Sequence, residues 1–354
     1  MANHEGDLSL RSVLMNLRQQ KLVDDEAIEQ IEREFEEQKA VHHEPWFVKF
    51  LLAVGAWVAA ICFLLFLGIV GLIEDDAWVL LGWGTVFIIT ATAMRQSCHH
   101  LFLVQLALAM STMGHGLTLT GTLFIDRGFN GFGIATLVSL ALCVILYFLY
   151  PDNLHRFLSC LLPPALATLW IGLEIENWLL LHLIVLIQVS IIGMVFIYNP
   201  RRVSLRPLGY ATAFSLSIVL FLVILPDRDF QAPWWPSNVI LAAALIWLFQ
   251  WIAGGWNKMR NEPMIIATVA TMGLATITTP GILSAIGLMV LGYARNDRYL
   301  LSMGMLFFPC FIVIFYYEWQ TSLMMKSWII GGSGAILLLV RWFLSFRGWA
   351  RVES

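Results

Sequence analysis

The sequence predicts an all-α fold: a polytopic bundle of about twelve transmembrane helices with a short N-terminal cytoplasmic helical hairpin. Of its 354 residues, 59% are hydrophobic and 13% are charged, and the mean hydropathy is +0.77. Soluble domains average roughly 45–50% apolar and about 25% charged residues. The apolar residues stand in long blocks between short polar loops, a pattern typical of helices and not of the alternating strands of a membrane barrel. The composition therefore excludes a water-soluble enzyme.

The charged and reactive residues exclude further classes of function. The net charge is −3 and no stretch of the chain is strongly basic, so we expect no nucleic-acid partner. No HExxH pair, nucleophile elbow or phosphate-binding loop is present, and we expect no catalytic residue, no cofactor and no enzymatic activity. The adjacent pairs His42–His43 and His99–His100 suit a metal poorly and are interpreted as solvated loop residues, so no metal site is expected. The five cysteines form no CxxC pair, which indicates small core residues without disulfides.

Residues 1–44 are predicted to form a cytoplasmic amphipathic helical hairpin. Each half carries one narrow apolar stripe at helical spacing, and the turn comes just before Asp24, a candidate N-cap. Such narrow stripes do not form an independent core, so the hairpin packs on itself, on a partner or on the membrane surface. Two interpretations stay open: a dimerisation or docking module that gives a homo-oligomer, and a solvated cytosolic lead-in. The stripes are Leu10, Val13, Leu14 and Leu17, then Ile28, Ile31 and Phe35.

Residues 45–346 are predicted to form the transmembrane domain, followed by a cytoplasmic tail at 347–354. A spanning helix needs about 20 mainly apolar residues at roughly 1.5 Å per residue. The apolar blocks, read in order, give twelve candidate spans: 47–73, 77–94, 101–124, 131–150, 157–173, 177–198, 207–225, 237–254, 263–279, 281–293, 299–317 and 327–344.

The segment 263–293 decides this count, because it reads either as one long helix or as two short ones. Pro280 lacks a donor N–H and clashes with the preceding turn, and Gly281 permits a tight reversal, so these two residues are the candidate helix break. The second half, 281–293, is short for a full crossing. It would form either a tilted short helix or a re-entrant hairpin shielded by its neighbours.

The distribution of basic residues favours the split and orients the chain. With twelve spans and a cytoplasmic N-terminus, the loops rich in Lys and Arg fall on the inner side, and the outer side holds only Arg127, Arg228 and Lys326. A single span at 263–293 would move four arginines to the side of the acidic loops and weaken this asymmetry. We therefore predict a multi-pass protein with both termini in the cytoplasm.

The third predicted span carries the most polar stretch at membrane depth. Ser111, His115, Thr118 and Thr122 recur at helical spacing, so one helix face presents three hydroxyls and an imidazole. Glycines on both sides of His115 would let another backbone approach closely. This candidate intramembrane face is interpreted either as a proton relay or substrate contact, or as a hydrogen-bonded contact between helices.

Acidic residues are missing from the middle of every predicted span. Ion-coupled transporters usually place Asp or Glu near the midplane, whereas Glu174, Glu176 and Glu318 lie at span ends on the outer side. This pattern argues against ion-coupled chemistry.

Short strings at the two ends of the predicted transmembrane domain carry a resemblance to a known family. The N-terminal one is PWFVKFLLAVGAW, at 45–57. The C-terminal ones are Thr279-Pro280-Gly281-Ile282, Gly292-Tyr293-Ala294-Arg295, Tyr316-Tyr317, Thr321, Lys326-Ser327 and Ser333-Gly334 ahead of Arg341. In these strings the chain resembles bacterial membrane proteins of the family called domain of unknown function 4401.

The resemblance implies a protein of the bacterial inner membrane and transfers neither an activity nor a catalytic residue. It also implies a partner, because members are often encoded beside a small membrane-anchored protein that carries a GDYXXLXY motif. Tyr316, Tyr317, Lys326 and Ser327 fall on the outer side of the predicted topology, where the soluble part of such a partner would dock.

Two functions follow from these observations. The first is a membrane scaffold or accessory subunit acting with the small membrane-anchored partner, favoured by the missing buried acids, the missing catalytic motifs and the helical hairpin. The alternative is a transporter or lipid-handling protein that uses a cavity near the polar face of the third span. An intramembrane enzyme has only His115 in its favour.

Overall fold

The computed structural model describes most of the predicted transmembrane domain. The described residues are 45–73, 76–97, 100–125, 131–224 and 233–318, with the single residues 324, 327 and 331. The predicted hairpin at 1–44, the tail at 347–354 and nearly all of the twelfth predicted span, 327–344, lie outside them.

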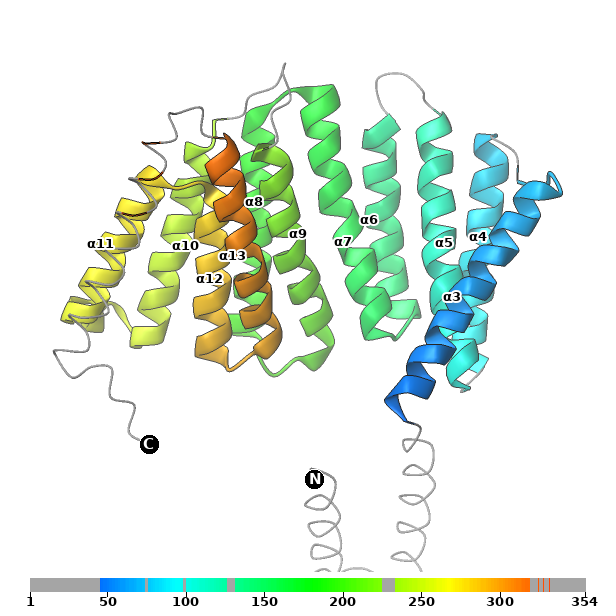
Figure 1. Ribbon diagram of the computed structural model, residues 1–354, viewed down its shortest axis with the longest axis horizontal. Coiled ribbons are helices and arrows are strands. Elements are labelled where there is room, and N and C mark those ends of the chain that lie inside the picture. The colour runs from blue at the N-terminus through cyan, green and yellow to red at the C-terminus, as the bar shows by residue number, and fades with distance from the viewer. Residues whose placement is uncertain are drawn as a thin grey trace, which may run out of the picture. The chain divides into compact units, whose positions relative to one another are not determined.

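The described residues form eleven α-helices, each of which matches one predicted span with ends that differ by a few residues (Figure 1). Short π-helical turns, η1 (Ile171–Ile175) and η2 (Met194–Tyr198), extend two of them, and short 3-10 turns, η3 (Val203–Leu205) and η4 (Trp256–Arg260), lie in loops. The helices are α3 (Trp46–Ile69), α4 (Ala77–Ser97), α5 (Leu101–Ile125), α6 (Gly131–Leu149), α7 (Asn153–Trp170), α8 (Trp178–Gly193), α9 (Arg206–Ile224), α10 (Trp235–Ala253), α11 (Glu262–Ile277), α12 (Pro280–Arg295) and α13 (Arg298–Glu318).

Nine of these described helices are long and apolar enough to cross a membrane, judged by length and composition. The other two, α11 and α12, have 16 residues each, or about 24 Å against a hydrocarbon core of about 30 Å. Large apolar side chains such as Phe50, Leu51 and Phe66 of α3 are more than half exposed, as expected for a lipid-facing surface. The prediction of an all-α membrane protein is confirmed, whereas the count of about twelve spans stays a prediction.

The chain divides into two compact units, residues 1–72 with 93–110 and residues 73–92 with 111–354. In the first unit, α3 approaches α5 at Gly55, where an added Cβ would lie 4.0 Å from Cε2 of Phe102. The second unit contains the main hydrophobic core and every polar cluster considered below.

In the second unit, successive helices from α6 to α13 run in opposite directions, so the loops gather at two ends (Figure 1). At one end, the described loops and helix termini include Glu174 and Glu176 and no Lys or Arg. The other end, which we call the basic end, holds the described basic residues of α6 to α13 and of the loops between them: Arg156, Arg201, Arg202, Arg206, Lys258, Arg260, Arg295 and Arg298.

Helix α7 begins four residues before its predicted start at 157. The carboxylate of Asp152 accepts hydrogen bonds from the backbone N–H groups of Leu154 (2.9 Å) and His155 (3.0 Å), which makes Asp152 the N-cap. His155, which falls between the predicted spans 131–150 and 157–173, therefore lies in the first turn of α7. It is buried, with 2% of its surface exposed.

The chain breaks between α11 and α12 at the predicted position, and the break is stabilised from outside. Pro280 begins α12, so the last carbonyls of α11 lose their normal helical donors. The buried Asn238 of α10 replaces them, because its Nδ2 donates to the carbonyls of Ala275 and Thr278, both at 2.7 Å. The split into two helices is observed; whether both cross the membrane stays open.

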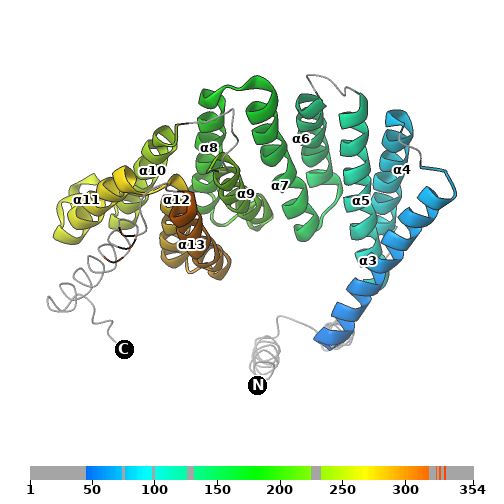
Figure 2. The ribbon, with the colours of Figure 1, turned by 45° about the horizontal axis from the view of Figure 1, so that its top comes forward.

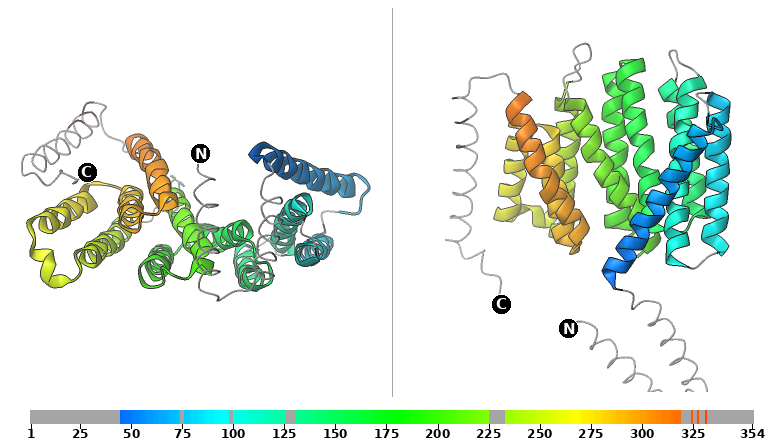
Figure 3. Two further views of the ribbon diagram at one scale, coloured as in Figure 1. Left: turned by 90° about the horizontal axis from the view of Figure 1, so that it is seen from below. Right: turned by 45° about the vertical axis from the view of Figure 1, so that its right-hand side comes forward.

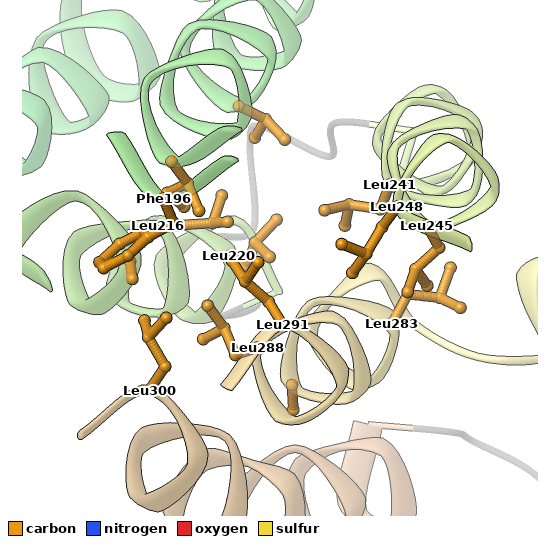
Figure 4. Close-up of a cluster of buried hydrophobic side chains, with 14 of the residues drawn as sticks. Phe196, Leu216, Leu220, Leu241, Leu245, Leu248, Leu283, Leu288, Leu291 and Leu300 are labelled. Carbon is orange, nitrogen blue, oxygen red and sulfur yellow. The ribbon is translucent and has the colours of Figure 1, made fainter. Parts of the chain in front are cut away.

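Helices α12 and α13 pack extensively against one another, and they lie side by side in Figure 2 and again in Figure 3. Gly281 permits this approach, since an added Cβ would lie only 2.1 Å from Cδ1 of Phe311. Around the pair, α8, α9 and α10 complete the main apolar core. Figure 4 shows leucines of α9, α10 and α12, including Leu220, Leu248 and Leu291, pointing toward one another.

The bond from Asn238 to the helix break gives a prediction about stability. Replacing Asn238 with Asp removes the Nδ2 donor without changing the shape of the side chain. Two buried carbonyls then lose their partner, at a cost of about 1–3 kcal/mol each. We expect the thermal unfolding midpoint of the detergent-purified protein to fall by several degrees.

The control is the same substitution at Asn177. Its side-chain oxygen accepts from the N–H of Leu179 (3.0 Å) as the N-cap of α8, a role that Asp fills equally well. Asn177→Asp should therefore leave the midpoint unchanged or raise it. Equal losses in the two variants would contradict the role assigned to Asn238.

Candidate functional site

A polar cluster joins α5 to α7 inside the second unit. The hydroxyl of Ser111 and Nε2 of His155 are 2.7 Å apart, and Nδ1 of His155 lies 3.2 Å from the hydroxyl of Ser159, one turn further along α7. Ser111, His155 and Ser159 are all buried. Both ring nitrogens of His155 thus have a hydroxyl partner, and the imidazole bridges two helices.

The position of His155 is fixed from the N-terminal side of α7 as well. The ring of Tyr150 stacks on the imidazole with a centroid distance of 4.3 Å and an interplanar angle of 30°, and Tyr150 is fully buried. Asp152 caps the same turn through the backbone N–H of His155. The signal in the sequence was the string Tyr150-Pro151-Asp152-Asn153, because Asp is a favoured N-cap and Pro is common just outside a helix.

His115 lies beside this cluster, one turn along α5 from Ser111. Its ring centroid is 6.2 Å from that of His155, and the side chain is 3% exposed. Among the described residues, no group lies within hydrogen-bonding distance of its Nε2. A buried imidazole nitrogen without a partner costs about 1–3 kcal/mol, so His115 differs from His155, whose two ring nitrogens both have partners.

The two threonines of the predicted polar face are buried but bond within their own helix. The hydroxyl of Thr118 donates to the carbonyl of Gly114 (2.8 Å), and that of Thr122 donates to the carbonyl of Leu119 (2.7 Å). The structure therefore places all four predicted residues on one buried face. Ser111 and His115 lie near His155, and the two threonine hydroxyls bond to backbone carbonyls of their own helix.

The threonine half of this face packs closely against α4. A Cβ added at Gly84 would lie 2.3 Å from Oγ1 of Thr118, and one added at Gly114 would lie 2.8 Å from the carbonyl oxygen of Gly84. The other glycine beside His115, Gly116, has no atom within 4 Å of an added Cβ. Of the two glycines beside His115, only Gly114 is thus required for the close approach of the α4 and α5 backbones.

Other buried polar side chains also join helices in pairs. Nδ1 of His182 in α8 lies 2.7 Å from the hydroxyl of Ser237 in α10, and Nε2 of Gln188 in α8 donates to the hydroxyl of Ser215 in α9 at 3.0 Å. With Asn238, these pairs connect α8 to α9 and α10, and α10 to α11. Sequence reasoning did not single them out, because isolated polar residues on separate helices reveal no partner.

Two carboxylates at the helix ends are engaged in capping. Glu174 accepts from the backbone N–H of Phe132 at the start of α6 (3.0 Å). Asp297 accepts from the phenol of Tyr210 (2.6 Å) and from the N–H of Tyr299 (3.0 Å) at the start of α13. Both carboxylates therefore stabilise helix termini.

The predicted docking residues are only partly described. Tyr316 lies near the end of α13 and is half-buried, and Ser327 is exposed. The side chain of Tyr317 and all of Lys326 lie outside the described residues. The described part of the chain contains no group of three or more His, Cys, Asp or Glu side chains placed to hold a metal ion. The thiols of Cys143 and Cys160 are 3.3 Å apart and both are free.

The hydrogen bond between Ser111 and His155 gives a second stability prediction. Ser111→Ala leaves Nε2 of a buried histidine without its partner, at a cost of about 1–3 kcal/mol. We expect a lower unfolding midpoint for the purified protein. In a double-mutant cycle with His155→Ala, the two losses should be less than additive, because both variants break one shared bond.

Ser217→Ala is the matched control. Ser217 is equally buried, but its hydroxyl donates only to the carbonyl of Ala213 in its own helix (3.3 Å). That carbonyl keeps its place in the helix when the hydroxyl is removed, so the midpoint should stay close to the wild-type value. Full additivity in the cycle would argue against the bridge between α5 and α7.

Comparison with known proteins identifies the family. The sequence profile described as "Domain of unknown function (DUF4401)" matches residues 45–346, most of the chain and all of the described helices. No curated protein and no solved structure matches this chain. The matched region begins just before α3 and includes the polar cluster on α5 and α7 as well as the helix break. The chain therefore belongs to the DUF4401 family of proteins of unknown function.

Proposed function

We propose that this protein is a membrane scaffold or accessory subunit of the bacterial inner membrane and that it is not an enzyme. The supporting observation is that its largest buried polar side chains, apart from His115, form hydrogen bonds between helices. His155, His182, Gln188 and Asn238 each bond to a residue of another helix. Polar groups used in this way fix the arrangement of helices.

The proposed topology has both termini in the cytoplasm and the basic end of the second unit on the cytoplasmic side. The positive-inside rule supports this orientation, because Lys and Arg accumulate in short cytoplasmic loops. Arg201 and Arg202 lie in one such loop, and Lys258 and Arg260 lie in the next one at the same end.

The proposed partner is a small membrane-anchored protein with a GDYXXLXY motif, docked on the outer side at Tyr316, Tyr317, Lys326 and Ser327. The resemblance of this C-terminal region to the family supports the choice of surface. The N-terminal hairpin, 1–44, is proposed as the surface for self-association. Neither role requires a buried acid or a catalytic group.

Co-purification tests the proposed complex. An affinity-tagged full-length protein should recover the GDYXXLXY protein after detergent extraction. The variant with alanine at all four docking positions should recover about tenfold less, because losing a few interface side chains worth 1.4 kcal/mol in total lowers affinity about tenfold.

The control is the double variant Tyr293→Ala/Arg298→Ala. Tyr293 is 81% exposed, and both residues lie at the basic end, away from the docking positions. It should recover as much partner as the wild type. If no partner is recovered with the wild type, or if the four-alanine variant recovers it fully, the proposed docking is wrong.

A second candidate function is a transporter or lipid-handling protein acting at the polar face of α5. The observation in its favour is His115, whose Nε2 is buried without a partner among the described residues. Such a nitrogen is available to a substrate or to a proton-carrying water.

His115→Ala distinguishes the two functions. A transporter would lose its phenotype in this variant while keeping its fold and its partner. A scaffold would keep the phenotype, provided that the unfolding midpoint stays close to that of the wild type. Growth or flux of the deletion strain complemented with each variant, read beside the unfolding midpoint, provides the measurement.

A further inference from the structure

The second unit contains an apolar pocket between α8, α9, α10 and α12, and this pocket is separate from the polar cluster on α5 and α7. Its cavity volume is about 70 Å³, several times the roughly 10–15 Å³ that one water molecule needs. Its wall is formed by aliphatic side chains such as Leu216, Leu241, Leu248 and Leu291, four of the leucines in Figure 4.

The pocket is elongated along the helices. Along α8 and η2 its wall runs from Val189 to Ile197, which is about 12 Å of helix axis. Ser284 supplies the only hydroxyl of the wall, and this buried hydroxyl has no partner among the described residues. A narrow, apolar and elongated space of this kind suits a hydrocarbon chain better than a polar solute.

Two polar contacts join the helices around the pocket. His182 bonds to Ser237 between α8 and α10 (2.7 Å), at the end of these helices away from the basic end. Gln188 bonds to Ser215 between α8 and α9 (3.0 Å), directly beside the pocket residues Val189 and Leu216. These contacts hold α8 against its two neighbours.

Toward the basic end, the pocket adjoins a second, aromatic space, which we call the mouth, and Ile197 and Trp247 line both spaces. The mouth is lined further by Tyr198, Trp251 and Trp256. Tyr and Trp favour the level of lipid headgroups, because their rings are apolar and their edges are polar.

Two cations stand at this mouth. Cζ of Arg295 lies 5.6 Å from the ring centroid of Trp251, a cation–π contact. Nζ of Lys258 lies 3.7 Å from the position of a Cβ built on Gly254, a residue of the mouth. An apolar slot with a guanidinium and an ammonium beside the residues of its mouth complements a molecule with an acyl chain and an anionic head.

We infer that this pocket binds one acyl chain of an anionic membrane phospholipid, with the phosphate of the headgroup at Arg295 and Lys258. The site is independent of the proposed partner complex and of the polar face on α5. The inference does not depend on either proposed function.

The test uses the full-length protein in nanodiscs that contain a trace of phosphatidylglycerol carrying a photoreactive group in the middle of one acyl chain. After illumination, label is counted on peptides of α8, α10 and α12 and compared with label on α3, whose large apolar residues are exposed and report the surrounding lipid. In the wild type, label should concentrate on the pocket helices. Phosphatidylcholine with the same chain should label them less.

Two matched pairs of variants test the slot and the mouth. Ala244 lines the pocket and Ala243 beside it is exposed, so Ala244→Leu should lower pocket labelling about tenfold while Ala243→Leu leaves it unchanged. Arg295→Gln should lower the preference for phosphatidylglycerol about fivefold, whereas Arg298→Gln, at the same end without the Trp251 contact, should not. Ser284→Ala should leave or raise labelling, because it makes the wall wholly apolar.

Several results would overturn the inference. Equal labelling of Ala244→Leu and Ala243→Leu, at the level of α3, would mean surrounding lipid only. Weaker labelling in Ser284→Ala would mean an occupant with a polar group in the slot. If Ala244→Leu does not fold, a displacement experiment on the wild-type protein replaces it. Excess unlabelled phosphatidylglycerol must then remove label from the pocket helices and not from α3. Equal displacement by phosphatidylcholine or by inorganic phosphate would refute an anionic phospholipid as the ligand.

Discussion

The structure depends on one constraint: a polar group inside the hydrocarbon region finds no water and must be satisfied by the protein itself. The helix break before Pro280 illustrates it, because Asn238 of α10 supplies the donors that the carbonyls of Ala275 and Thr278 have lost. The two ring nitrogens of His155 are likewise satisfied within the protein, because a serine hydroxyl lies beside each of them. Each such bond connects two elements, or two turns of one helix, so satisfying polar groups also fixes the positions of the helices.

The same constraint divides the α8 to α12 region along its length. The pair His182–Ser237 holds α8 against α10 at the end away from the basic end, and the pair Gln188–Ser215 holds α8 against α9 near the middle of both helices. Toward the basic end, mainly apolar and aromatic side chains line the pocket and its mouth, and dispersion contacts between them are easily exchanged for contacts with lipid chains. Space for a ligand therefore exists where no polar pair requires the helices to touch.

The general fold was predictable from the sequence because it follows from the lengths of the apolar blocks and from the position of Pro280 between two of them. The break at Pro280 was found by its missing donor, and the shared face of Ser111 and His115 was found by helical periodicity. The partner of that face was missed because His155 stands in a polar stretch, Asp152 to Arg156, that reads as a loop until Asp152 is recognised as an N-cap. The pocket was not predictable, since it depends on the distances between four helices and not on any string of residues.

Few residues of this chain are charged, and the charged side chains of Asp297 and Arg295, at the turn between α12 and α13, make specific contacts. Asp297 accepts from Tyr210 and from the first turn of α13, so a single carboxylate fixes the turn between α12 and α13. Arg295, two residues earlier, contacts Trp251 at the mouth of the pocket. In the proposed topology, the loops that hold Arg295 and Lys258 face the cytoplasm, where the leaflet is rich in anionic lipid. In that topology, the basic residues that orient the chain also place the mouth of the pocket at the leaflet whose headgroups complement its charge.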